Sequence, residues 1–357
     1  MMKEFIAQTR FELLDAEHVL TLVCAHMIEH DAEVEMRGET RILRFLDTQA
    51  DLTCEGNEVL IDVRSKTIEG IYFTRMALTS HILEFSEHKI PLFEWTGDGE
   101  TIVRPPNFQI LEVVGCRNIT PHMRRIAFKT ENIARFTSMD ALHLNILVQH
   151  PDRTEPQWPT VGSNGLVHWE EPQTRPVFRK YTVRSLDIHT GIMEIDFVLH
   201  DDAGPGSALA EEIKVGDQVG VMGPGGGGLA EADWYLFAGD ETALPAIGRM
   251  LEHLPETARG IAVIEVADQH EIQPLTTYSS VEIRWLLRDG QAAGTTSKLG
   301  NAVRNIALPD DGLAIYVWAG CEYETFRTIR SYLRTECGLK KHEHLVVSYW
   351  RRGEGAE

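Results

Sequence analysis

The chain after position 233 alternates between short apolar runs and longer amphipathic stretches, and this alternation constrains the fold more than any other feature. The apolar runs are nearly continuous, which is typical of strands buried on both faces of a parallel sheet. Parallel strands need crossover connections, so the amphipathic stretches between them predict helices that cover the sheet. The predicted strands are 234–238, 260–266, 281–287, 313–319 and 345–349, and the predicted helices lie near 243–254, 295–306 and 322–337.

The block from 108 to 222 has a different pattern, with strand-length runs separated by turn signals. Many short strands at this spacing predict a small antiparallel β-barrel. A proline-rich segment over about 150–177 interrupts the block, and a loop of that length is commonly functional or disordered. The predicted barrel strands are 108–114, 125–128, 142–148, 180–183, 193–199 and 218–222.

The first block reads as a small α+β domain with helices near 15–30 and 66–87 and short alternating strands such as 34–36, 41–45 and 58–63. A chain of 357 residues is too long for one ordinary core, which agrees with several domains. The glycine run 223–228 lacks the Lys-Ser/Thr of a phosphate-binding P-loop, so we interpret it as part of a linker. The predicted boundaries are 1–95 for the α+β domain, 96–107 for a linker, 108–222 for the barrel, 223–233 for a second linker and 234–357 for the α/β domain.

Charge and cysteine content exclude several classes of protein. A net charge of −20 argues against nucleic acid and against an anionic membrane surface as partners. No apolar run is long enough to span a membrane, and the first residues do not form a signal peptide. Five cysteines without a paired spacing predict reduced thiols in the cytoplasm. His26 and His30 are four residues apart but have no evident third ligand, so no metal site is expected.

Residues 179–184, Arg-Lys-Tyr-Thr-Val-Arg, combine two guanidinium groups, an aromatic ring and a hydroxyl within one predicted strand. A bound flavin requires such groups, because its pyrophosphate needs cations, its ring needs a flat surface and its reactive edge needs a hydrogen bond. Strand alternation would place Arg179, Tyr181 and Val183 on one face and Thr182 and Arg184 on the other. An ordinary barrel strand with solvated arginines remains the alternative.

Two further segments are candidates for binding a nucleotide. One follows His200: Gly204, Gly206, Ser207 and Ala208 open a short helix whose free N–H groups could bind a pyrophosphate. This second phosphate site favours FAD over FMN. A capped Gly-Pro turn is the alternative.

The other segment follows the first strand of the predicted parallel sheet, at the edge where ligands bind in such sheets. No Gly-x-Gly-x-x-Gly occurs there, and the acidic side chains favour the nicotinamide end of a dinucleotide over its phosphates. The segment consists of Gly239, Asp240, Glu241, Thr242 and Ala243.

We call residues 179–184 the flavin cassette and residues 239–245 the nucleotide loop. Their order along the chain resembles that of the ferredoxin–NADP reductase superfamily. The amino-acid sequences of the cassette, of the loop at 239–245 and of Tyr349-Trp350-Arg351 are similar to those of the siderophore-interacting proteins. Members of that family are flavin-dependent ferric-siderophore reductases. The resemblance covers about residues 108–353. Gly206 and Leu209 depart from it, where the family has Ala and Trp, and so does Cys321.

The resemblance implies FAD as cofactor, NADPH more than NADH as electron donor, and a ferric siderophore as substrate. Ferredoxin is an alternative donor. The alternative functions are a general NAD(P)H:flavin reductase and a non-catalytic ferric-siderophore-binding protein. The first block occurs ahead of such reductases and has no assigned function.

The resemblance also implies roles for single residues. Tyr181 would lie against the isoalloxazine ring and Thr182 near its reducible nitrogen, while Arg179 and Arg184 would meet phosphate and ribityl groups. Cys321 would lie beside the nicotinamide, with a buried structural thiol as the alternative. The remaining cofactor-binding candidates are Arg288 and Lys298 for the 2′-phosphate of NADPH, and Tyr349, Trp350 and Arg351 near the flavin.

Overall fold

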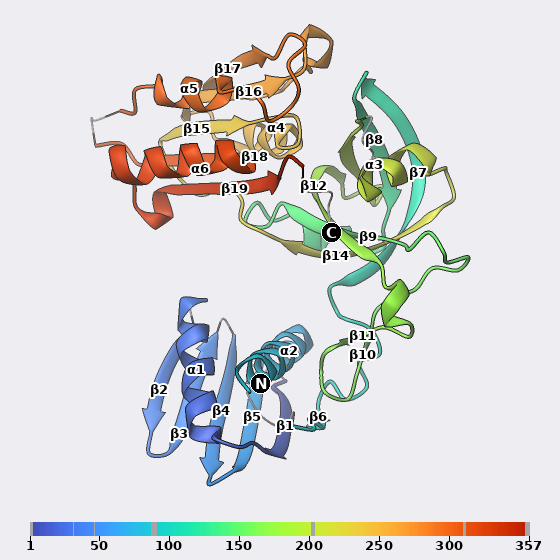
Figure 1. Cartoon of the computed structure of the whole chain (residues 1–357), viewed down its shortest axis with the longest axis vertical. Helices are drawn as coiled ribbons and strands as arrows, with labels where there is room; N and C mark the ends of the chain where they lie inside the picture. Colours follow the sequence, from blue (N-terminus) through green and yellow to red (C-terminus); the bar gives the residue numbers. More distant parts are fainter. Residues whose placement is uncertain are drawn as a thin grey trace. The chain divides into compact units, whose positions relative to one another are not determined.

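The computed structural model describes residues 3–30, 32–45, 47–86, 91–200, 204–309 and 312–353. The chain divides into two compact units. The first combines Met1–Phe108 with Pro151–Arg175, and the second combines Gln109–His150 with Pro176–Glu357. The predicted fold class, an α+β domain, an antiparallel barrel and a parallel α/β domain, is confirmed (Figure 1).

The first unit contains an antiparallel sheet in the order β2-β3-β4-β5-β1-β6. Inward-facing side chains such as Val59, Ile61 and Val63 on β5 are fully buried and pack with apolar residues of the two helices. Three strands, β1, β4 and β6, were not predicted from the sequence. The elements are β1 Phe5–Glu12, α1 Ala16–Glu29, β2 Glu33–Arg37, β3 Thr40–Phe45, β4 Thr48–Glu55, β5 Glu58–Ser65, α2 Ile68–Phe85 and β6 Trp95–Gly97.

The proline-rich segment belongs by its contacts to this first unit, although the sequence-based boundaries placed it within the barrel block. It forms a short hairpin, β10 (Thr160–Val161) with β11 (Val167–His168). The Thr79 hydroxyl donates to the Asn164 carbonyl at 3.0 Å. The Trp95 N–H donates to the Ser163 carbonyl at 3.2 Å. The segment is therefore anchored to α2 and β6.

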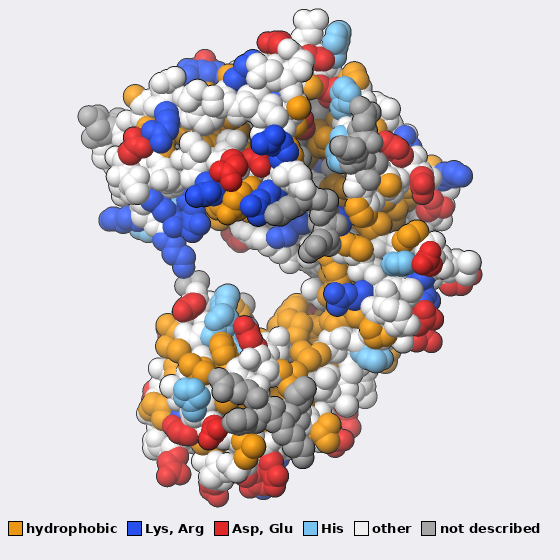
Figure 2. Space-filling model, viewed as in Figure 1, with side chains coloured by type: hydrophobic (Ala, Val, Ile, Leu, Met, Phe, Trp, Pro, Cys, Tyr) orange, Lys and Arg blue, Asp and Glu red, His pale blue; other side chains and the backbone are white. Residues whose placement is uncertain are grey.

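Histidines meet on the helices of the same unit. Nε2 of His26 and Nε2 of His30 are 3.1 Å apart, and the ring of His81 on α2 lies 4.4 Å from that of His26. Figure 2 shows histidine side chains (pale blue) on the surface of this unit beside acidic ones. Among the described residues, no group of three or more His, Cys, Asp or Glu side chains is arranged to hold a metal ion.

The second unit begins with a closed barrel in the order β12-β13-β8-β7-β14-β9. Its interior is filled by large apolar side chains, among them Phe128, Ile146, Ile195 and Val221. A short helix, α3, packs on β13 and β9. The elements are β7 Phe108–Thr120, β8 Met123–Lys129, η1 Ile133–Phe136, β9 His143–Val148, β12 Val177–Asp187, β13 Ile192–Val198, α3 Pro205–Glu212 and β14 Gln218–Gly225.

The remainder of this unit is a parallel sheet in the order β17-β16-β15-β18-β19. The chain runs outward from β15 on one side and then returns to β18 on the other, which makes the carboxyl ends of β15 and β18 a topological switch point. Helix α4 packs on one face and α5 and α6 on the other. The elements are β15 Trp234–Gly239, α4 Leu244–His253, β16 Arg259–Val266, η3 Gln269–Glu271, β17 Ser280–Leu287, α5 Lys298–Arg304, β18 Ile315–Glu322, α6 Tyr323–Ser331, η4 Tyr332–Glu336, η5 Lys341–Glu343 and β19 His344–Trp350.

Polar contacts join the barrel to α4. The buried guanidinium of Arg249 donates to the carbonyls of Val183 and Phe136, at 3.1 and 2.6 Å. Arg184 of β12 forms a two-pronged ion pair with Glu252, with N–O distances of 3.0 and 2.7 Å. These contacts hold the flavin cassette against the first helix of the α/β sheet.

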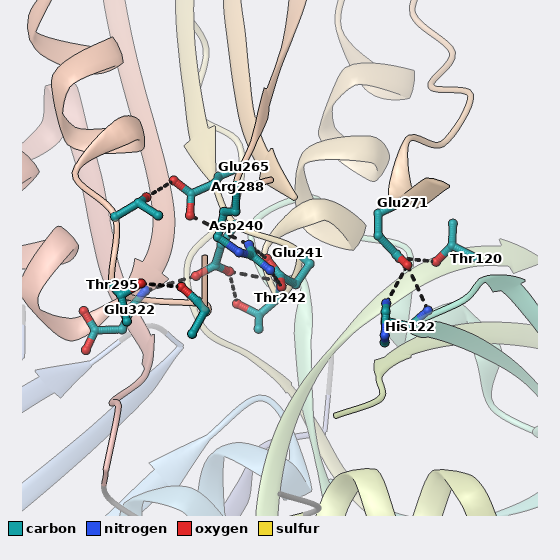
Figure 3. Close-up of polar contacts among 12 residues, drawn as sticks. Thr120, His122, Asp240, Glu241, Thr242, Glu265, Glu271, Arg288, Thr295 and Glu322 are labelled. Atoms are coloured by element: carbon teal, nitrogen blue, oxygen red, sulfur yellow. Dashed lines mark hydrogen bonds and ion pairs between the residues drawn. The ribbon is translucent and has the colours of Figure 1, made fainter. Parts of the chain in front are cut away.

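A second junction joins η3 to the β7–β8 hairpin. Glu271 is 5% exposed and accepts hydrogen bonds from the Thr120 hydroxyl at 2.5 Å and from the His122 N–H at 3.0 Å (Figure 3). A buried carboxylate is stable only when such donors satisfy it. The barrel and the sheet are thus tied at two separate places.

We expect Glu252→Ala to lower the stability of the second unit by about 1–3 kcal/mol, because it leaves the buried Arg184 guanidinium without its partner. Glu256→Ala, at an exposed position just after α4, is the matched control. Thermal denaturation followed by circular dichroism measures the effect. Equal melting temperatures for the two variants would contradict the role assigned to this ion pair.

Candidate functional site

The carboxyl ends of β15, β18 and β19 meet at the side chain of Asp240. This carboxylate accepts hydrogen bonds from the Glu322 N–H at 3.2 Å and from the Thr242 N–H at 3.0 Å (Figure 3). It also accepts one from Nε1 of Trp350 at 2.8 Å. Burial, with a further contribution from the neighbouring Glu241, raises the pKa of Asp240 to about 6. At the predicted ligand edge of the sheet, the Asp240 carboxylate therefore links the ends of three strands by hydrogen bonds.

Arg288 lies beside this carboxylate and is 4% exposed. Its guanidinium forms a two-pronged pair with Glu241, at 2.6 and 2.5 Å, and lies 3.7 Å from Glu265 (Figure 3). Lys298 donates to the carbonyl of Leu287. Both cations that the sequence suggested for a 2′-phosphate are thus engaged by groups of the protein.

Thr182, His143 and Tyr349 form a cluster where the barrel meets the last strand of the sheet. Thr182 and His143 are register partners on β12 and β9, and both are buried. The hydroxyl of Tyr349 lies 2.5 Å from Nε2 of His143 and also interacts with the Thr182 side chain. The Tyr349 ring stands edge-on to the His143 ring and to that of Trp318.

This cluster is uncharged at neutral pH. Burial, with a smaller contribution from Lys180, lowers the pKa of His143 to about 4. Desolvation around its hydroxyl raises the pKa of Tyr349 above the usual range. Among the described residues, none forms a hydrogen bond with Nδ1 of His143. A Cβ atom at Gly226 would lie 2.7 Å from this nitrogen, so the second glycine-rich linker passes close to the cluster.

Tyr181 packs against Phe197, with ring centroids 4.2 Å apart, and its hydroxyl lies over Gly206 at the start of α3. A Cβ atom at position 206 would overlap that hydroxyl, which explains the glycine where the family has alanine. The Ser207 hydroxyl accepts from the His200 N–H at 3.4 Å, and the Ala208 N–H donates to the Gly204 carbonyl. The cassette and the helix start are therefore in direct contact.

Other predicted site residues have structural partners. Cys321 is 1% exposed and lies in the core between the sheet and helices α5 and α6. Val183 is in the barrel core. The guanidinium of Arg179, whose pKa is lowered by burial, donates to the Phe178 carbonyl. The guanidinium of Arg351 lies over the Tyr323 ring.

The nucleotide segment itself is tightly packed. The Ala243 N–H donates to the Asp240 carbonyl, and a Cβ atom at Gly239 would lie 2.6 Å from that of Ala243. Gly239 is thus needed where β15 passes close to the start of α4.

The residues present fit a flavin. A half-buried guanidinium, a glycine-lined helix start and an aromatic ring lie on one side, at Arg179, Gly206 and Tyr181. The hydroxyl of Thr182 and the orphaned Nδ1 of His143 lie at the junction with the sheet. Hydrogen-bonding groups without charge suit the polar edge of a flat, largely apolar ring.

Comparisons with known proteins identify the family of the chain. Residues 112–228 match the siderophore-interacting FAD-binding domain, and residues 232–353 match the siderophore-interacting protein domain. A siderophore utilization protein from T. fusca is 36% identical, with a TM-score of 0.64 over 71% of this chain and 97% of its own. The chain belongs to the siderophore-interacting protein family.

Two further relatives of this family cover the same part of the chain. The ferric vibriobactin reductase ViuB of Vibrio cholerae is 28% identical over 70% of this chain and 91% of its own. The siderophore-interacting protein SipS from Aeromonas hydrophila is 29% identical, with a TM-score of 0.60 over 70% of this chain and 93% of its own. Residues 8–96 match a family of uncharacterized bacterial proteins, DUF2218.

Sequence reasoning missed His143. The residue stands near the start of a predicted strand and looks like any barrel residue there. Its partner Tyr349 is 206 positions away, and no local pattern reports such a contact. Only its pairing with Thr182 in the β12–β9 ladder could have suggested it.

We expect Gly206→Ala to reduce the bound flavin severalfold, because the added methyl group must displace the Tyr181 hydroxyl. Gly115→Ala, on strand β7 of the same barrel, is the control, since a Cβ atom there makes only an ordinary contact of 3.7 Å with that of Ala127. The absorbance ratio of flavin to protein after purification measures the effect. If both variants retained full flavin, the contact between the cassette and α3 would have no part in binding.

The buried His143 should make stability depend on pH. Its folded-state pKa of about 4 lies below the ordinary histidine pKa of 6.5, so the unfolded chain binds the proton more tightly. Its contribution is complete above pH 6.5 and falls by up to about 3 kcal/mol as the pH drops toward 4. Asp240 acts oppositely, because its raised pKa of about 6 favours the folded state as the pH falls.

The two effects are separated by comparing the wild type with His143→Gln, which lacks the titrating ring. The pH slope of wild-type stability between 4.5 and 6.5 should exceed that of the variant by roughly one proton. Denaturant unfolding at several pH values measures both slopes. Parallel curves would mean that His143 does not titrate as its burial demands.

Proposed function

We propose that this protein is an FAD-dependent ferric-siderophore reductase that takes electrons from a nicotinamide nucleotide. The observation that carries the proposal is the contact of Tyr349, on the last strand of the α/β sheet, with Thr182 and His143 of the barrel. This contact would join the nucleotide-binding edge of the sheet to the flavin-binding residues of β12. The similarity to a ferric vibriobactin reductase supports iron–siderophore complexes as the substrate class.

The residues of the chain would divide the work as follows. Arg179 and the N–H groups at the start of α3 would bind the pyrophosphate of FAD, and Tyr181 would support its ring. The Thr182 hydroxyl would hydrogen-bond the reactive edge. FAD would supply the conversion of a two-electron hydride donor into single electrons for iron.

The protein needs no iron ligands of its own in this scheme. Fe(III) is held tightly by the hard oxygen donors of a siderophore, and reduction to Fe(II) weakens that hold. The chain's task is to orient the two partners and to leave one flavin edge accessible to the chelate. A cytoplasmic location suits this role, and no helix among the described residues is long and apolar enough to cross a membrane.

Arg184, Arg288 and Cys321 receive structural roles in this proposal. Arg184 pairs with Glu252 and Arg288 with Glu241, so each cation helps to hold the sheet and the barrel in shape. Cys321 fills the core beneath α5 and α6. The preference for NADPH over NADH, which was predicted from Arg288 and Lys298, therefore rests on the family resemblance alone.

We expect the purified protein to carry FAD. Under anaerobic conditions NADPH should bleach the FAD absorbance, and a ferric siderophore should restore it. A chromogenic chelator would detect the Fe(II) that is released. Thr182→Val, which replaces the hydroxyl by a methyl group, should slow bleaching about tenfold, or about 1.4 kcal/mol. Thr190→Val, at an exposed turn, is the control. Stopped-flow absorbance measures both rates, with NADH run in parallel.

Each alternative gives a distinct result in this assay. Protein without flavin would favour a non-catalytic siderophore-binding role. Bleaching by reduced ferredoxin but by neither nucleotide would replace the proposed donor. Re-oxidation by free flavin but not by ferric siderophores would favour a general flavin reductase.

A further inference from the structure

The first unit contains a buried cation that the reductase activity does not use. Arg75 lies on α2 and is 3% exposed. Among the described residues, none accepts a hydrogen bond from its Nε. Burial lowers the pKa of the Arg75 guanidinium, yet an arginine keeps its proton in proteins. A buried charge of this kind calls for an anionic partner.

The guanidinium faces a cavity of about 320 Å³, which is within the size range of small-molecule sites. Apolar surface is supplied by Trp95, Ile102 and Val161, and the Trp95 ring centroid is 5.6 Å from Cζ of Arg75. Exposed Glu94 and Glu100 also line it, and the charge of Glu100 is felt by Arg75. The cavity therefore has a positive charge at its buried end, from Arg75, and negative charges at its exposed rim, from Glu94 and Glu100.

The walls of the cavity are fixed by hydrogen bonds. Nε1 of Trp95 donates to the Thr79 hydroxyl at 3.1 Å, and the Val161 N–H donates to the Val103 carbonyl at 3.0 Å. Gly99 adopts a φ of +88°, and a Cβ atom there would lie 2.8 Å from Nη1 of Arg75. The backbone thus makes room for the guanidinium instead of supplying it with a partner.

We propose that this cavity binds a small apolar zwitterion of the amino-acid type. The carboxylate pairs with Arg75, the side chain packs on Trp95, Ile102 and Val161, and the ammonium group meets Glu94 and Glu100. A monoanion would neutralise Arg75 but would bring a further negative charge close to the two carboxylates of the rim, whereas a zwitterion satisfies both ends. The site is independent of the flavin and of the proposed reductase activity.

Isothermal titration of the full-length protein with phenylalanine, 3-phenylpropionate and phenethylamine tests the proposal. These probes share the ring and differ in carrying both charges, the carboxylate only or the ammonium only. Phenylalanine should bind at least tenfold more tightly than either single-charge probe. Absence of phenylalanine binding, or equal binding of 3-phenylpropionate, would overturn the proposal.

Two variants separate binding from folding. Arg75→Met keeps the length of the side chain and removes the charge, so it should abolish phenylalanine binding, while Arg10→Met at an exposed site of the same unit should not. Glu100→Gln, at the exposed rim, should weaken phenylalanine binding severalfold, whereas binding of the anion 3-phenylpropionate should strengthen because one repelling charge is gone. If Arg75→Met fails to fold, an unchanged affinity in Glu100→Gln still refutes the zwitterion.

Discussion

The arrangement of the second unit depends on the hydrogen bonds of the Arg249 guanidinium. Arg249 projects from α4 and donates to the carbonyls of Val183 and Phe136 in the barrel domain. Burial lowers the pKa of Arg249 to about 10, so the guanidinium remains charged at neutral pH. Removing this side chain would leave the two carbonyls without their donor. This contact holds α4, the helix that follows the first parallel strand, against β12, which carries residues 179–184.

Charge is distributed unevenly around that junction. The groups that would meet the flavin edge, Thr182, His143 and Tyr349, are neutral at physiological pH. The buried charged groups lie at the strand ends of the sheet, where Arg288 is paired with Glu241 and where Asp240 links three strand ends. Neutral donors and acceptors beside a reacting ring avoid the desolvation cost of a buried ion, while paired ions behind them hold the backbone in place.

The proline-rich segment shows that order along the chain and order in space can differ. It leaves the barrel after β9 and returns at β12, but its hydrogen bonds go to α2 and β6 of the first unit. The backbone groups of a segment without long strands must be paired somewhere, and here the small α+β unit supplies the partners. The same segment supplies Val161 to the wall of the Arg75 cavity. The first unit is thus built from two stretches of sequence.

Hydrophobic periodicity together with turn signals determined the fold class, because continuous apolar runs, alternating runs and amphipathic stretches each favour a different way of burying apolar surface. Local motifs likewise marked Tyr181, Thr182 and the segment after β15. Only the tertiary structure decided which polar residues have partners. Arg184 and Arg288 look like free cations in the sequence, but each has a carboxylate partner 68 or 47 positions away. His143 and Arg75 stand out only in the folded chain, since burial and an unfilled hydrogen bond result from long-range packing that no local pattern encodes.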